Sequence, residues 1–440
     1  MIQDHSTELL RGPIFHTPSP PALVHIPDGA LLIRGGRIAA CGHFADLQRA
    51  HPQAASTDLR GGFLLPGFID THTHFPQVRI IGGMGLPLLE WLEQRALPEE
   101  ARMSDARYAA QVAQEFVHSL ASHGTTTAMV FGAHFAHATA GLFEAAARSG
   151  LRIVCGQVFS DRQLRPELHQ TAESSYRDAS ELIRRFHGRG RLLYAVTPRF
   201  ALSASEAILE VCQTLMSEHP GVRFQTHINE NEAEIAAVAK MFPWAQDYLA
   251  VYERYGLGGP RAVMAHNVHS TDSQLERMAA AGTSVAHCPS SNASLGSGIF
   301  PMARHRRAGV RFALGADIGA GTGFGVMKEG LQAYLMQRAA PGGTVLGAAQ
   351  LLYLATKAGA EARALDHETG DFTPGKSADI AYVKAPEGSP LAAVLQRATA
   401  PEDVLAAIFT LADAECIQEV RVAGDVILFH RLAPSPRKFS

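Results

Sequence analysis

Residues 65–74 read LPGFIDTHTH, an apolar run that ends in two histidines, His72 and His74. Side chains two positions apart on an extended strand point to the same side of that strand. Two imidazoles that converge at a strand end form half of a site for a divalent metal ion. A surface strand that merely contains histidines is the alternative, and it is the commoner meaning of an isolated His-x-His. The preceding Pro-Gly and the apolar run favour the metal site.

Three later segments repeat the pattern of an apolar strand that ends in a possible metal ligand. RFQTHINE contains His227 and, three residues later, Glu230; AVMAH ends in His266, and RFALGAD ends in Asp317. Each of these residues alone could be a polar group satisfied within a core. Four strand ends that carry His-x-His, His, His and Asp, in this order, favour one shared metal site.

Strand-like and helical segments alternate through the middle of the chain. Besides the four strands above, apolar or β-branched runs bounded by Gly, Pro or charge lie at 125–132, 152–159, 191–199 and 283–288. Amphipathic helical segments lie at 105–123, 173–186, 205–219 and 272–281. Eight strands separated by helices predict an α/β fold, a TIM-like (β/α)₈ barrel, in which catalytic groups sit at the carboxyl ends of the strands.

The two ends of the chain have a different character. Short β segments surround residues 30–41, and strand-and-turn sequence returns at 369–383 and 419–429. We therefore predict a small β-sandwich domain built from both termini, residues 1–66 and 369–440. It would flank a catalytic barrel of residues 67–368.

Composition limits the classes of partner and compartment. The chain has 440 residues, 46% of them hydrophobic, and a formal net charge of −3, so no broad basic field favours nucleic acid. Its five cysteines are widely spaced and form no Cys-x-x-Cys pair, which is typical of a reducing compartment. No signal-peptide layout and no membrane-length apolar run is visible, so we expect a cytoplasmic protein without a membrane partner.

Taken together, these motifs resemble the amidohydrolase superfamily and, within it, the guanine deaminase family. PGFIDTHTH and the order of the metal-site residues are similar to the superfamily pattern, and DFTPGKSAD resembles a turn of its small β-sandwich. The likeness to guanine deaminases rests on FPQ at 75–77, LPLLEWL at 86–92, PRFALS at 198–203, THINEN at 226–231 and AHCPSSN at 286–292. One departure is Asn229, where many relatives carry serine.

The resemblance implies a homodimeric enzyme that converts guanine to xanthine and ammonia with one zinc ion per chain, or iron in its place. The implied metal ligands are His72, His74, His227 and Asp317. The implied catalytic residues are Glu230 as the proton carrier, His266 as the group that orients water, and Asp317 as the acceptor of its proton. The implied substrate contacts are Gln77, Arg199, Phe200 and His227.

Chemistry alone leaves two of these roles open. It does not separate a His266 that binds metal from one that orients water. A salt bridge at the barrel rim is the alternative role for Arg199. The number of metal ions is better defined. Two-metal members of the superfamily often bridge their ions through a carbamylated lysine. No lysine lies between His74 and His227 in this sequence. We therefore expect a single catalytic metal.

The alternatives are a deaminase of a different purine, a pterin or an s-triazine, and a noncatalytic scaffold, which the complete ligand set argues against.

The other histidines and nearby side chains receive lesser roles. His134 and His137 are given no metal role, whereas Glu90 and Trp91 are expected in packing or in a lid. We expect His187, His219 and His305 at the surface, the last within a solvated helix face at 304–307. Cys288 is not expected to pair with His287 as a nucleophile, because adjacent residues on a strand face opposite ways.

Overall fold

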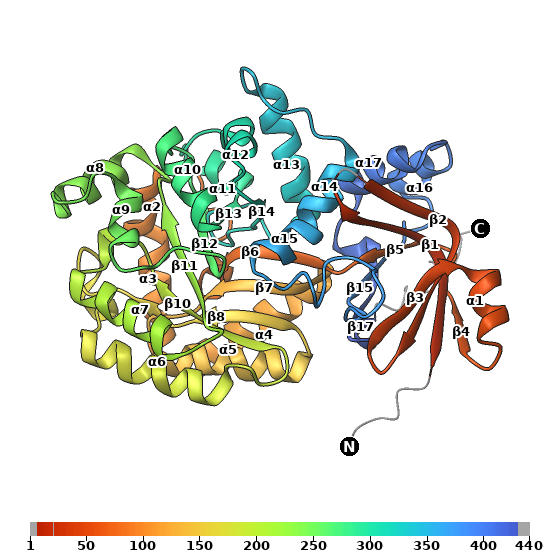
Figure 1. The fold of residues 1–440 in the computed structure, drawn as a ribbon, viewed down its shortest axis with the longest axis horizontal. Helices are drawn as coiled ribbons and strands as arrows, with labels where there is room; N and C mark the ends of the chain where they lie inside the picture. Colours follow the sequence, from red (N-terminus) through yellow and green to blue (C-terminus); the bar gives the residue numbers. More distant parts are fainter. Residues whose placement is uncertain (1–6, 21, 430–440) are drawn as a thin grey trace, which may run out of the picture.

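The barrel strands are short apolar runs that become buried on both faces, as parallel strands covered by helices require. The computed structural model describes residues 7–20 and 22–429. It contains eight parallel strands paired in the order β14-β13-β12-β11-β10-β8-β7-β6 (Figure 1). Their bounds are β6 Phe68–His74, β7 Thr125–Phe131, β8 Arg152–Gly156, β10 Leu192–Pro198, β11 Arg223–Ile228, β12 Ala262–His266, β13 Ser284–His287 and β14 Phe312–Leu314; the short β9, Val158–Phe159, pairs with β10.

The barrel is closed by contacts between its first and last strands. The backbone N–H of Asp317 donates to the carbonyl of His72 at 2.9 Å, and the Thr71 hydroxyl donates to the carbonyl of Leu314 at 2.8 Å. The prediction of a (β/α)₈ barrel is confirmed, and all eight predicted segments form barrel strands.

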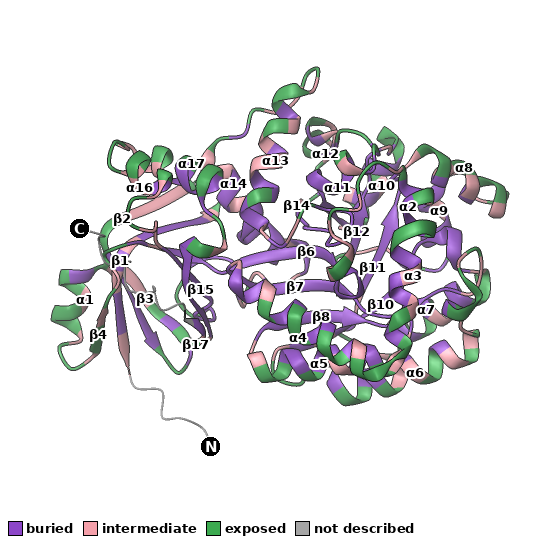
Figure 2. Ribbon diagram, turned by 180° about the vertical axis from the view of Figure 1, so that it is seen from behind, coloured by how far each residue is buried: buried purple, intermediate pink, exposed green. Residues whose placement is uncertain are grey.

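Helices cover the outside of the barrel, with their buried faces against the strands and their exposed faces outward (Figure 2). The α-helices are α1 Phe44–Ala50, α2 Leu88–Trp91, α3 Leu97–Ala101, α4 Ala106–Ser122, α5 Ala136–Ser149, α6 Ala172–Phe186, α7 Glu206–Glu218, α8 Glu232–Met241, α9 Tyr248–Glu253, α10 Asp272–Ala281, α11 Pro289–Ser294, α12 Met302–Ala308, α13 Val326–Ala339, α14 Ala348–Ala355, α15 Lys357–Ala362, α16 Pro390–Leu395 and α17 Pro401–Leu411. Shorter or irregular helical turns lie at Phe75–Ile80, Leu92–Ala96, Arg102–Ser104, Pro166–Leu168, Ala201–Ser203 and Ala414–Cys416.

Side-chain caps explain why the predicted helices begin where they do. The Asp105 carboxylate accepts from the backbone N–H groups of the first turn of α4, and the Ser205 hydroxyl accepts from the third residue of α7. Thr171 and Thr271 form capping boxes at α6 and α10. Such caps satisfy N–H groups that the helix itself cannot pair.

A second sheet joins the two ends of the chain. Its strands are β1 Glu8–Ser19, β2 Ala22–Arg34, β3 Arg37–His43, β4 Ala55–Asp58, β5 Phe63–Pro66, β15 Ile380–Val383, β16 Ile417–Val422 and β17 Asp425–Phe429. The order is β17-β16-β15-β5-β1-β2-β3, with β4 on β1, and antiparallel pairing of β5 with β15 connects the terminal segments. The sheet lies beside the end of the barrel where the strands begin (Figure 1).

Several elements of this region were not predicted from the sequence, among them the helix α1. The long strand β1 was not predicted, nor were α16 and α17, which lie between β15 and β16. Residues 1–6 and 430–440, also assigned to the terminal domain, lie outside the described residues. No helix in the described ranges is both long and apolar enough to cross a membrane.

Gly156 lies where two barrel strands pack closely, so adding a side chain there should destabilise the fold. A Cβ atom at this position would lie 1.6 Å from the carbonyl oxygen of Ala195. We expect Gly156→Ala to lower the free energy of unfolding by at least about 1–3 kcal/mol, measured by urea denaturation. Gly141→Ala is the control, because open space surrounds Gly141 within α5, and it should raise stability by about 0.5–1 kcal/mol. Equal stability of the two variants would contradict this packing.

Candidate metal centre and substrate pocket

Four predicted ligand residues meet at the carboxyl ends of the barrel strands. Nε2 of His72 and Nε2 of His74 lie 3.2 and 3.4 Å from Oδ1 of Asp317, and Nε2 of His74 lies 3.2 Å from Nε2 of His227. Ligands held about 2.0–2.2 Å from a tetrahedral metal ion are separated by about 3.3 Å. The spacing of these buried atoms therefore fits a shared cation.

Hydrogen bonds behind the site fix the orientation of two imidazoles. Nδ1 of His227 lies 2.6 Å from the carbonyl oxygen of Arg199. A carbonyl only accepts, so Nδ1 carries the proton and Nε2 presents its lone pair to the centre. Nδ1 of His266 lies 2.9 Å from Oδ1 of Asn292. Such outer contacts orient metal-binding histidines in general.

The electrostatics favour the protonation states that metal ligands need. Burial lowers the pKa values of His72, His74 and His227, which keeps these imidazoles neutral. Burial alone would raise the pKa of Asp317, but the facing imidazoles, His72 first among them, hold it well below its usual value. Three neutral imidazoles and one carboxylate are the donor set that zinc and iron accept.

Glu230 and His266 stand next to this group. Nε2 of His266 lies 3.5 Å from Oε2 of Glu230 and 3.8 Å from Oδ2 of Asp317. Burial, reinforced by the charge of Asp317, raises the pKa of Glu230 well above its usual value. The Glu234 carboxylate accepts from the backbone N–H of Glu230 at 3.1 Å and so holds its loop.

The backbone is unusual at three of these strand ends. Asn229, His266 and Asp317 have φ values of 48°, 71° and 46°, in the left-handed region. Such conformations cost roughly 1–3 kcal/mol each for residues other than glycine and cluster at functional sites. Asparagine tolerates this region better than most residues, which gives the unusual Asn229 a conformational role.

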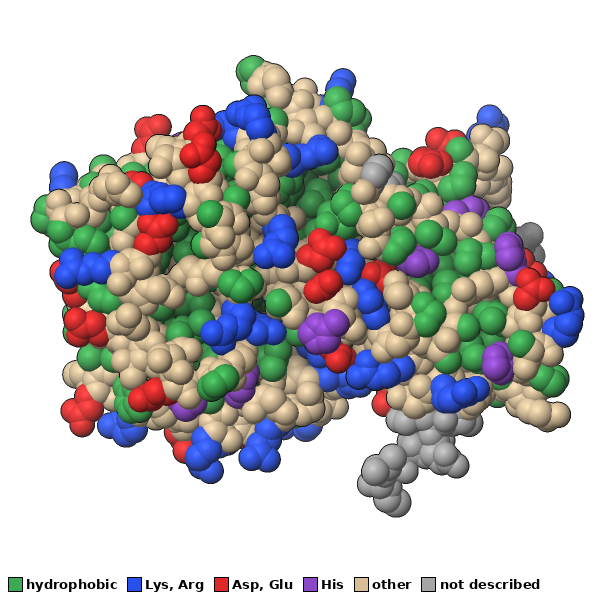
Figure 3. Space-filling model, in the orientation of Figure 1, with side chains coloured by type: hydrophobic (Ala, Val, Ile, Leu, Met, Phe, Trp, Pro, Cys, Tyr) green, Lys and Arg blue, Asp and Glu red, His purple; other side chains and the backbone are tan. Residues whose placement is uncertain are grey.

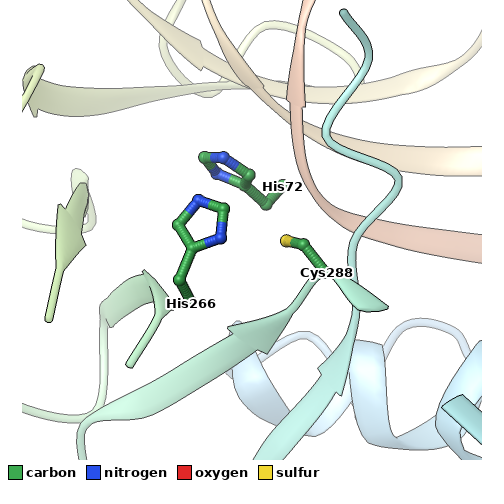
Figure 4. A group of neighbouring side chains, drawn as sticks. All are labelled: His72, His266 and Cys288. Carbon is green, nitrogen blue, oxygen red and sulfur yellow. The ribbon is translucent and has the colours of Figure 1, made fainter. Parts of the chain in front are cut away.

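A second group of possible ligands consists of His72, His266 and Cys288 (Figure 4). It shares His72 with the first group, so both describe one centre. Burial raises the pKa of the Cys288 thiol well above its usual value, which disfavours the thiolate that binds metals. The ring of His287 instead stacks on that of Phe300, with 4.3 Å between the ring centroids. Its side chain thus points away from this thiol, as expected for neighbours on a strand.

A small cavity opens beside the centre. Its lining residues are His74, Gln77, Leu88, Trp91, Leu92, Arg199, Phe200, His227, Glu230, His266, Leu295, Asp317 and Ala320. The cavity holds about 20 Å³, roughly the space of one water molecule. A larger ligand therefore requires the wall to move. Leu88, Trp91 and Leu92 belong to that wall, so the segment expected in packing or in a lid does border the cavity.

Glu100, a buried acid that contacts two lining residues of the pocket, was not predicted from the sequence. Both of its oxygens accept from Nη1 of Arg199, at 2.7 and 2.8 Å, and Oε1 also accepts from Nε2 of Gln77 at 2.8 Å. Nδ1 of His134 lies 3.3 Å from Oε2. Burial alone would raise the pKa of Glu100, but Arg199, His134 and the hydrogen bond from Gln77 together outweigh burial and lower that pKa. The salt bridge considered for Arg199 thus exists, and both of its side chains are buried.

Another expectation was wrong: His305 is buried. Its Nε2 lies 3.0 Å from Nδ2 of Asn267, and its ring lies 4.2 Å from that of Phe300. The basic neighbours suggested a solvated face, and Arg306 and Arg307 are indeed exposed, but His305 occupies the inner side of α12. His187 and His219 are half-buried. Neither His134 nor His137 belongs to a metal-type cluster among the described residues.

Comparison with known proteins places these observations in a family context. A model described as the amidohydrolase family matches residues 63–427, and an imidazolonepropionase-like composite domain of bacteria matches residues 29–54. The chain is 54% identical to a probable guanine deaminase of Deinococcus radiodurans, over 96% of this chain and 98% of that protein. It also resembles the solved structure of E. coli guanine deaminase, with 36% identity, a TM-score of 0.92 and coverage of 97% and 100%. A guanine deaminase from C. acetobutylicum, solved with bound guanine in its active site, matches with 25% identity, a TM-score of 0.89 and coverage of 96% and 100%.

The buried ion pair makes a prediction about stability. Glu100→Gln keeps the shape of the side chain but leaves the charge of Arg199 buried without its counter-ion. We expect the free energy of unfolding to fall by about 3 kcal/mol or more in chemical denaturation. Glu115→Gln removes an acid from a partly exposed ion pair with Arg79. This control should change the free energy of unfolding by less than about 1 kcal/mol. Similar losses in both variants would mean that the pocket pair is no more important than a surface pair.

Proposed function

The chain belongs to the amidohydrolase family, and we propose that it hydrolyses the amino group of guanine to give xanthine and ammonia. The observation that carries this proposal is near-full-length similarity to guanine deaminases, together with a metal-type cluster beside a buried pocket that both polar and apolar side chains line. A deaminase of another purine, a pterin or an s-triazine is the alternative, and substrate tests separate them.

We propose that His72, His74, His227 and Asp317 hold one zinc ion, with ferrous iron as the alternative. The fit of the interatomic distances to a tetrahedral site supports this assignment, as do the fixed tautomer of His227 and the low pKa of Asp317. When bound, zinc lowers the pKa of water to about 7 and supplies Lewis acidity. The absence of lysine between His74 and His227 supports a single ion.

Three residues would handle the protons of the reaction. Glu230 has a raised pKa, so it holds a proton more readily than an exposed glutamate does, which suits a general acid–base group. We assign it the delivery of a proton to the base and to the departing amino group. His266, held by Asn292, would orient the attacking water, and Asp317 would accept its proton.

The opposite wall suits a neutral base. Glu100 balances the charge of Arg199, and it engages only Nη1, so the remaining donors of the guanidinium can meet the O6 and N7 acceptors of guanine. Because Nε2 of Gln77 donates to Glu100, its Oε1 is left as an acceptor for an N–H of the base. Phe200 and the ring of His227 line the cavity and would pack against the purine.

Three further features remain predictions. These are the division of the chain at 66/67 and 368/369, a homodimeric assembly, and a cytoplasmic location. Five free cysteines, four of them buried, support a reducing compartment.

The metal assignment predicts a stoichiometry. Elemental analysis of purified protein should give about one zinc or iron per chain. His72→Ala or His74→Ala should lose most of the metal and the activity together, because each removes a direct donor. His137→Ala is a matched control, since its Nε2 contacts the Met103 carbonyl outside the centre, and it should retain the metal. Two tightly bound ions per active chain, or full retention in the ligand variants, would contradict the assignment.

If Glu230 carries protons, replacing it should lower turnover without releasing the bound metal. Glu230→Gln keeps the size of the side chain but cannot exchange a proton, so turnover should fall by about two to four orders of magnitude. Metal content should stay at the wild-type level. Turnover close to wild type would make Glu230 a structural carboxylate and assign the proton to another group.

The substrate itself is tested by ammonia release over a panel of guanine, adenine, cytosine and guanosine. Adenine would place an amino group opposite Arg199, and a buried donor left unpaired costs about 1–3 kcal/mol. Guanosine adds a ribose to the base, so its binding would need a larger displacement of the cavity wall than guanine does. Guanine should therefore react far faster than the others. Comparable rates on adenine, or no ammonia from guanine by metal-loaded protein, would overturn the proposal.

A further inference from the structure

A second polar cleft lies at the opposite end of the barrel, where the strands begin. It measures about 710 Å³, within the range of roughly 300–1,000 Å³ found for small-molecule sites. The barrel contributes the starts of β8 and β11 and the turn before β10, and the terminal sheet contributes the β2–β3 and β16–β17 turns. Figure 3 shows Lys and Arg side chains gathered at the junction between barrel and sheet, with a few acidic ones among them.

The cleft is lined mainly by positive charge. Its lining includes four arginines, Arg37, Arg152, Arg191 and Arg223, and the two histidines His187 and His367, against the single carboxylate of Glu368. This local excess of positive charge contrasts with the chain as a whole, whose formal net charge is −3.

Arg152 is the least satisfied charged side chain of this lining. It is 7% exposed, yet its Nε is buried without a hydrogen-bond partner in the described part of the chain. Its nearest acid is Glu368, with 3.8 Å between Nη2 and Oε2. The same Glu368 oxygen already accepts from Nη2 of Arg37 at 3.3 Å. One carboxylate oxygen therefore faces two guanidinium groups, and at 3.8 Å it is too far from Arg152 for a hydrogen bond.

The other charges around the cleft increase this imbalance. Burial lowers the pKa values of Arg191 and Arg223, so their charged forms lack full compensation. Asp379 and Asp425 attract Arg191, but the Asp379 carboxylate already accepts from Ser377, Thr369 and the backbone N–H of Ala423. Arg363 lies fully buried nearby, and its charge is also opposed by those of Arg152 and Arg223.

We propose that this cleft binds a small phosphate-bearing anion, with Arg152 and Arg223 as its central contacts. The planar forks of arginine match phosphate oxygens in pairs, and several arginines facing one cleft suit a ligand with more than one negative charge. The shared chemistry is that of a diphosphate, whether inorganic or part of a nucleotide. Because the metal ligands sit at the other ends of the strands, this site is separate from the reaction centre and does not depend on its substrate.

Isothermal titration of the metal-loaded protein tests the proposal. The probes are inorganic pyrophosphate, GDP and ADP, with adenosine as the uncharged comparison, and metal content is measured after each titration to detect chelation. We expect the diphosphates to bind and adenosine not to bind. Equal affinity for pyrophosphate and nucleotides would identify a phosphate site alone, whereas tighter nucleotide binding would show that the base also makes contacts.

Variants locate the binding. Arg152→Gln should weaken it about 10- to 100-fold, since it removes charge-assisted hydrogen bonds. Arg152→Lys keeps the charge but not the fork and should be intermediate. Arg184→Gln, on the exposed face of α6, should bind as the wild type does. Hydrogen exchange should slow around residues 187–193 and 221–223 when pyrophosphate binds. No binding by any diphosphate, equal binding by Arg152→Gln and wild type, or protection confined to the metal centre would overturn the proposal.

Discussion

The seam between β6 and β14 is the constraint on which the rest of the structure depends. The Asp70 carboxylate accepts from the backbone N–H groups of His72 at 3.1 Å and of Ala316 at 3.0 Å. The Asp317 N–H donates to His72 across the same seam. One buried carboxylate therefore closes the barrel and sets the relative positions of two proposed metal ligands. Burial raises the pKa of Asp70 to about 7, which shows how far it is removed from water.

Glycine makes this close approach possible. A Cβ atom at Gly315 would lie 2.8 Å from Cβ of His72 and 3.0 Å from Sγ of Cys288. The short strand β14 can therefore lie directly against β6, and Asp317 reaches the histidines from a left-handed backbone conformation. The geometry of the centre follows from barrel closure, in which a chain segment near residue 70 meets one near residue 315.

Much of this arrangement could be predicted from sequence because its signals are local. Each barrel strand is an apolar run with clear boundaries, and His72, His74, His227, His266 and Asp317 each end or follow such a run. The regular alternation with helices then places all the ends at one rim. The family resemblance added roles that strand patterns cannot provide, such as that of Glu230.

The features that were missed depend on long-range contacts. Glu100 lies in a helical turn that resembles a solvated Pro-Glu-Glu surface segment, and only the fold brings it to Arg199 and Gln77, 99 and 23 residues away. The interior position of His305 depends on packing against Phe300. The strand β1 pairs with β2, β4 and β5, which are three separate segments of the chain. The arginines of the second cleft are likewise separated by up to 186 residues, so no local motif could reveal them.

The central claim is that His72, His74, His227 and Asp317 form one metal site. X-ray absorption at the metal edge of the purified protein tests it most directly. The account predicts a first shell of nitrogen and oxygen at about 2.0–2.2 Å, with the outer-shell scattering of several imidazole rings. A sulfur scatterer at about 2.3 Å would instead assign Cys288 as a ligand, and a shell without imidazoles would contradict the site altogether.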